Sequence, residues 1–131
     1  MMQTQNYPTS SFEYIPPAND PDQESQLDLL VRLYEGAIAF LNKAIKACES
    51  SEIDQFKYFI QRGRRIIEEF QNTLDFTEGG LVPTQLNDLY EYMLDSLTQA
   101  TLTHDTLFVE RVNEQLEVLL DGWRGLQQPS H

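Results

Sequence analysis

The chain has 131 residues, with 21 acidic and 9 basic side chains and a net charge of −12. This length gives one hydrophobic core rather than two, and an apolar content of 40% is enough for that core to pack. Because phosphate backbones and anionic lipid surfaces are bound through Lys and Arg, the charge argues against nucleic acid and anionic membranes as partners.

The single cysteine, Cys48, excludes an internal disulfide and a cysteine-rich zinc site. The first residues lack the basic and apolar regions of a secretory signal, and no apolar run approaches the roughly 18 residues of a membrane span. We therefore expect a cytoplasmic protein that does not insert into a membrane.

Proline placement divides the chain into a tail and a helical remainder. Four of the six prolines lie within the first 21 residues. Because interior proline breaks an α-helix, we expect residues 1–24 to form an extended or disordered tail and residues 25–126 to form a helical domain. The tail contains apolar side chains that could fold back over a groove as a cap. These are Tyr7, Phe12, Tyr14 and Ile15.

Apolar residues recur at spacings of three and four along the chain after the tail, which is typical of amphipathic helices. The first stretch predicts a helix over residues 25–50, with Ser25 as its N-cap. The second predicts a helix over residues 53–76, followed by a stop at residues 78–80. Gly63 lies within the second stretch and indicates a close crossing with another helix.

The third apolar stretch runs from Leu86 to Ala100, and the fourth from Val109 to Trp123. A break is expected over residues 101–105, where Thr103 or Asp105 could cap the last helix. The short connections favour antiparallel neighbours, and no strand-like alternation competes with the helices. The sequence therefore predicts an all-α protein, an antiparallel up-down four-helix bundle with an extended N-terminal tail.

No motif supplies evident catalytic chemistry. A di-metal bundle needs Glu-x-x-His pairs, and neither His104 nor His131 follows a glutamate by three residues. The chain has no P-loop or nucleophile elbow, so we expect no enzyme, no catalytic residue, no cofactor and no metal. One alternative is a phosphotransfer-type signalling bundle that uses His104, although this residue falls in the expected break. Another alternative is a non-catalytic helical adaptor.

The second helix carries a broad apolar stripe, and apolar surface beyond the needs of a core indicates a groove for a partner. For each of these residues the other interpretation is that it fills the core. We expect partner contacts at Phe56, Phe59, Ile60, Ile67, Leu74, Tyr90, Met93 and Leu97.

The one basic cluster consists of Arg62, Arg64 and Arg65. It can form salt bridges with acids such as Glu68 and Glu69, or it can form a docking patch for an anionic partner. Because only part of the cluster can share one helix face, salt bridges are the expected role.

Several short motifs occur in a fixed order from about residue 25 to residue 124. They are Leu33-Tyr34-Glu35-Gly36-Ala37-Ile38, Phe40-Leu41, Leu74-Asp75, Gly79-Gly80, Leu89-Tyr90-Glu91-Tyr92-Met93 and Trp123. Taken together they resemble the flagellin-specific export chaperones, the FliS family. The chain departs from the family pattern in its longer Pro-rich tail and at residues 81–84.

The resemblance implies a cytosolic, non-enzymatic chaperone of the flagellar type III secretion system. Such proteins bind the disordered C-terminal segment of flagellin in apolar grooves, prevent its premature polymerisation and deliver it to the membrane export gate. We expect helices two, three and four to form the groove. If the tail competes with cargo, deletion of residues 1–20 will tighten flagellin binding. The sequence leaves open which flagellin is bound and whether the free protein dimerises.

Overall fold

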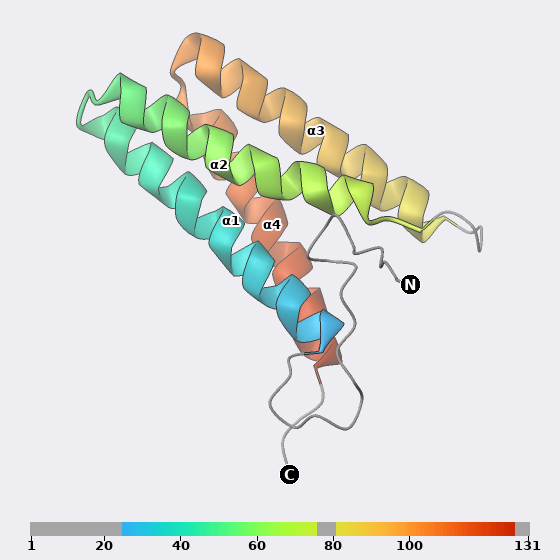
Figure 1. Ribbon diagram of the computed structural model, residues 1–131. Coiled ribbons are helices and arrows are strands. Elements are labelled where there is room, and N and C mark those ends of the chain that lie inside the picture. The colour runs from blue at the N-terminus through green and yellow to red at the C-terminus, as the bar shows by residue number, and fades with distance from the viewer. Residues whose placement is uncertain (1–24, 76–80, 128–131) are drawn as a thin grey trace, which may run out of the picture.

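The computed structural model describes residues 25–75 and 81–127, and this part of the chain contains four α-helices and no strand (Figure 1). The helices are α1 (Gln26–Glu49), α2 (Ile53–Asn72), α3 (Val82–Thr103) and α4 (Thr106–Leu126). The predicted tail, including its proposed cap residues, and the expected stop at residues 78–80 lie outside the described residues.

The helices pack in chain order around a common core. α1 contacts α2 and α4, and α3 contacts α2 and α4. Figure 1 shows successive helices running in opposite directions, which confirms the all-α antiparallel bundle. It also shows α1 and α4 diverging from α2 and α3 at one end. We call this the open end, and we call the end with the turns at residues 50–52 and 104–105 the closed end.

Local hydrogen bonds explain where the helices begin. The Ser25 hydroxyl accepts from the Asp28 backbone N–H at 3.0 Å, which confirms the predicted N-cap of α1. The Asp105 carboxylate caps α4 in the same way, accepting from the Leu107 N–H at 3.0 Å. α3 has no side-chain cap, but a proline lies in its first turn, where the missing N–H has no intrahelical acceptor to lose.

Two predicted helix boundaries differ from the structure. α2 ends at Asn72 rather than residue 76, and the following Thr73 hydroxyl donates to the Phe70 carbonyl at 3.0 Å. α3 continues through residues 101–103 and ends at Thr103, and the C-cap residue His104 adopts a left-handed conformation with φ of 58°. α4 includes both of its glycines and ends at Leu126, where the expected helical domain also ends.

The core contains an aromatic cluster with one member from each helix. Tyr34 of α1 stacks on Phe70 of α2, with ring centroids 4.3 Å apart, and the Trp123 ring of α4 lies 6.3 Å from Tyr34. The Phe70 ring also packs against the Tyr90 ring of α3, with their centroids 5.6 Å apart. The buried hydroxyls of Tyr34 and Tyr90 hydrogen-bond to each other, so the diagonal helices α1 and α3 are joined across the bundle.

The expected close crossing at Gly63 is present. A Cβ built there would lie 2.7 Å from Leu41 Cδ2 and 3.6 Å from the Ala37 carbonyl oxygen, so α1 and α2 approach closely because residue 63 has no side chain. Gly36 makes no such close approach. A Cβ at residue 36 would meet only Ile66 Cδ1, at an ordinary contact distance of 3.8 Å.

Candidate docking groove

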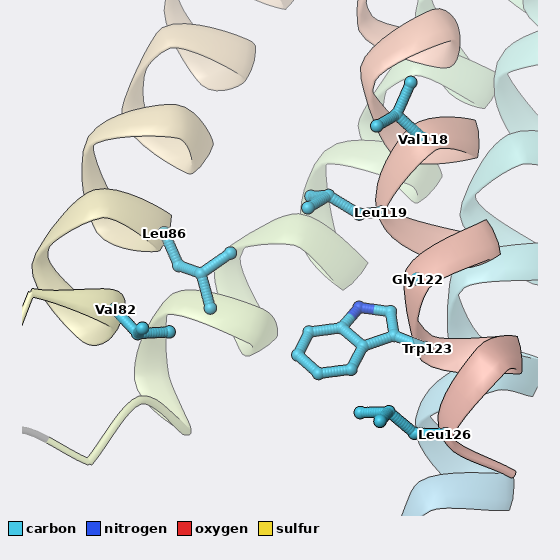
Figure 2. A pocket seen from close by; sticks show the side chains of 7 residues that line it. All are labelled: Val82, Leu86, Val118, Leu119, Gly122, Trp123 and Leu126. Atoms are coloured by element: carbon cyan, nitrogen blue, oxygen red, sulfur yellow. The ribbon is translucent and has the colours of Figure 1, made fainter.

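An open apolar recess of about 350 Å³ lies between the start of α3 and the end of α4 (Figure 2). We call it the α3–α4 recess. Its lining residues are Val82, Leu86, Val118, Leu119, Gly122, Trp123 and Leu126. Figure 2 shows the Trp123 ring extending from α4 toward Leu86 and Val82 of α3. The recess is therefore part of the open end, where the two helices diverge.

The rim of the recess exposes large apolar side chains. Val82 is 63% exposed, Val118 is 71% exposed and Leu126 is 61% exposed, whereas Leu86 and Leu119 are partly buried. Scattered apolar residues are common on protein surfaces, but a concave group of this kind is typical of a binding groove.

Polar contacts hold the last turns of α4 against α1 on the side away from α3. Arg124 forms an ion pair of 2.6 Å with Glu35, and the Gln127 side chain donates to the Asp28 carboxylate at 2.8 Å. Gly122 adds no side chain to the recess, and the space where a Cβ would lie is empty. The fold thus fixes the end of α4 while leaving its α3-facing side apolar and open.

The aromatic cluster forms the support beneath the recess. Burial raises the pKa of Tyr34 above the usual tyrosine value. The pKa of Tyr90 is also raised, first by burial and then by its neighbour Tyr34. Both hydroxyls are therefore neutral at physiological pH, and neither tyrosine lines the recess itself.

Most of the predicted partner contacts lie inside the bundle. The buried members are Phe56, Ile60, Ile67, Tyr90, Met93 and Leu97. Phe59 and Leu74 are partly buried against the same core. None of the eight lines the α3–α4 recess. Their contact with a partner stays a prediction, and for the buried members it requires the helices to separate.

The sequence interpretation missed most of the recess. Val82 precedes the third apolar stretch, which was expected to begin at Leu86, but Pro83 fits the first turn of a helix and α3 begins at Val82. The signal in α4 was the apolar run Val118–Leu120, which is too wide for one face of a helix to bury completely. Only Trp123 had been singled out, as a family motif.

His104 and Cys48 lie together at the closed end. The Cys48 thiol donates to the His104 backbone carbonyl at 3.4 Å, and the His104 ring meets the edge of Phe56 at 6.0 Å between centroids. His104 ends α3 in a turn. A phosphotransfer bundle needs its histidine in the middle of a helix, so this position does not favour that alternative.

Across residues 25–75 and 81–127, no group of three or more His, Cys, Asp or Glu side chains is placed to hold a metal ion. None of the helices described here is long and apolar enough to cross a membrane.

Comparison with known proteins settles the family. The model of the family "Flagellar protein FliS" matches residues 18–130. The chain belongs to the FliS family. It is 36% identical over 109 residues to a flagellar secretion chaperone FliS from Campylobacter jejuni, which covers 81% of this chain and 83% of that protein. It is 31% identical over 98 residues to the flagellar secretion chaperone FliSB from Pseudomonas aeruginosa, covering 75% and 78%.

A solved structure described as a flagellar chaperone from bacteria has the same fold. Its TM-score is 0.72 at 20% identity, covering 82% of this chain and 87% of that one. The family resemblance drawn from the short motifs is therefore confirmed. The membership supports the role of a flagellar export chaperone for this chain.

Proposed function

We propose that this protein is a cytoplasmic, non-enzymatic chaperone that binds the C-terminal segment of flagellin in the α3–α4 recess. The observation that carries the proposal is the exposed apolar lining of the recess, in a member of a family of flagellar secretion chaperones. A segment that folds as an amphipathic helix would place its apolar side chains in the recess and keep its polar side in water.

Binding of this kind prevents premature polymerisation because the flagellin segment is covered while it is held. The ordering of a disordered cargo costs conformational entropy, so a large contact area is compatible with release. Release would occur at a component of the flagellar type III export gate, which we propose as the second partner in the delivery step.

The test is calorimetric titration of the full-length protein with the C-terminal segment of flagellin from the same organism. We expect saturable binding, a negative heat-capacity change and added helix by circular dichroism. Trp123 is the single tryptophan and lies in the recess, so its fluorescence should change as the segment binds. An intact peptide that does not bind the folded protein would refute the cargo assignment.

A matched pair of variants locates the binding site. Val118 in the recess is 71% exposed and Leu102 outside it is 72% exposed, so either can become glutamate with little effect on folding. We expect Val118→Glu to weaken flagellin binding at least about tenfold, because a charge would be buried against the cargo. Leu102→Glu should bind like the wild type. Equal effects of the two changes would place the cargo elsewhere.

A further inference from the structure

Positive charge is concentrated on one part of this acidic chain. Six of the nine Lys and Arg residues fall between residues 43 and 65, which include the end of α1 and the first half of α2. The same interval contains three acidic residues, and α3 contains no Lys or Arg. This stretch of the α1–α2 pair is therefore locally basic although the protein as a whole is strongly acidic.

Aromatic rings and cations are interleaved on this side. The Arg62 guanidinium carbon lies 4.9 Å from the centroid of the Phe40 ring and 5.8 Å from that of Tyr58. The Lys43 ammonium lies 5.7 Å from the centroid of Phe59. The Phe59 ring contacts Tyr58 at 5.2 Å and Phe40 at 6.4 Å. We call these five residues the cation–aromatic patch.

The patch is accessible to a partner. Lys43 and Arg62 are exposed, Tyr58 is 50% exposed, and the two phenylalanines are partly buried beneath them. Continuous contacts between rings and cations thus give a surface that offers both positive charge and apolar area.

The cations of the patch have no acidic partner within the described residues. Of the basic cluster in α2, Arg64 has the expected salt bridge, with Glu68 at 3.3 Å, and it also donates to the Leu94 carbonyl of α3. Arg62 instead donates to the Tyr58 hydroxyl at 2.9 Å and packs on rings. No carboxylate of residues 25–75 or 81–127 forms an ion pair with Arg62 or Lys43.

We propose that the cation–aromatic patch binds an acidic segment of a second protein. Arg62 is held over Phe40 with one N–H donated to Tyr58, and its other N–H groups can bind a carboxylate. Lys43 supplies a second positive charge, and the rings between them accept an apolar side chain. Nucleic acid is disfavoured as the occupant because its binding depends on many Lys and Arg contacts to phosphates, whereas the patch contains only Lys43 and Arg62.

The patch and the α3–α4 recess are on opposite sides of the bundle. α1 and α2 are neighbours, and each contacts one of the other two helices, so the α1–α2 pair faces the α3–α4 pair across the core. The two surfaces share no residue. An acidic partner can therefore bind while the recess is occupied, which extends the proposed function to a complex of three components.

The test uses the full-length protein and a labelled, amidated helical peptide in which two glutamates one turn apart flank a leucine. A matched peptide has glutamines in place of the glutamates. By fluorescence anisotropy we expect saturable binding of the glutamate peptide, at least about tenfold weaker binding of the glutamine peptide, and a further loss when salt is raised from about 0.05 to 0.5 M.

Two charge reversals provide the control. Arg62→Glu should weaken binding of the glutamate peptide at least about tenfold, because it places a carboxylate against the peptide's own. Arg111→Glu changes the net charge equally, at an exposed position on α4, and should change binding by less than about twofold. Circular dichroism should show both variants folded. Equal losses in the two variants would mean general electrostatic attraction and would overturn the proposal.

Three other outcomes would also refute binding of an acidic segment of a second protein at the cation–aromatic patch. Loss of peptide binding in Val118→Glu would place the peptide in the recess instead. No binding to the wild type would refute a second-protein site. If binding appeared only after Glu13, Asp20, Asp22 and Glu24 were replaced by their amides, the occupant would be the chain's own acidic tail. The peptide test needs no flagellin, so failure of the cargo assignment leaves its result interpretable.

Discussion

The closed and open ends of the bundle are built from the same four helices but cover their apolar residues differently. At the closed end, short turns bring Phe56 and His104 together, and Phe56 is fully buried. At the open end, α3 and α4 leave Val82, Val118 and Leu126 mostly exposed. Burial of Phe56 stabilises the fold at one end, whereas the exposed apolar side chains at the other line the recess in which we propose that cargo binds.

The largest expected effect on stability comes from replacing one apolar side chain by alanine at each end of the bundle. Phe56→Ala should lower the free energy of unfolding by about 3–5 kcal/mol, because it leaves a cavity in a close-packed core. Leu86→Ala removes a partly buried side chain from the recess and should cost about 1 kcal/mol. Urea denaturation of both variants measures the difference. Similar losses would show that the open end is packed as tightly as the closed end.

Alkaline pH tests the buried tyrosine pair beneath the recess. Because the folded-state pKa values of Tyr34 and Tyr90 are raised, the unfolded chain loses these protons first as pH rises above about 10. Unfolding then releases protons, so stability falls with pH, by up to about 1.4 kcal/mol per pH unit for each tyrosine. Denaturation from pH 8 to 11 should show this slope, and a variant with phenylalanine at both positions should have a shallower one.

The hydroxyl contact itself is tested by a double-mutant cycle. Tyr34→Phe or Tyr90→Phe alone should cost about 1–2 kcal/mol, because each leaves one buried hydroxyl without its partner. The double variant should cost less than the sum of the two, since both polar groups are removed together. Additive losses in chemical denaturation would show that the two hydroxyls do not stabilise each other.

The smallest effect compares two glycines in the α1–α2 contact. Gly63→Ala should destabilise by about 1 kcal/mol, because the clash with the buried Leu41 outweighs the gain in helix propensity. Gly36→Ala has room for its methyl group and should stabilise by about 0.5–1 kcal/mol. In thermal unfolding, Gly63→Ala should lower the melting temperature and Gly36→Ala should raise it. A stabilising Gly63→Ala would show that Leu41 moves without cost.

Much of the fold could be predicted because its signals are local. Ser25 and Asp105 cap their helices through hydrogen bonds within three residues, and apolar spacing identified all four helices. Two boundaries were wrong, because α2 ends at Asn72 and α3 continues through residues 101–103. The predicted salt bridge is present at Arg64 but not at Arg62. Arg62 packs on two rings instead. Tyr58 lies one helical turn before it in α2, and Phe40 is brought to it by the packing of α1 against α2.

The sequence by itself determined the four helices, the Ser25 cap of α1, the close crossing at Gly63 and the family. Only the tertiary structure decided which apolar residues are covered. Ile60 and Val118 both lie in apolar stretches, yet Ile60 is buried between helices and Val118 borders the α3–α4 recess. Helical periodicity shows which residues share a face, but burial depends on how closely the next helix approaches that face. That distance is set by all four helices packing together.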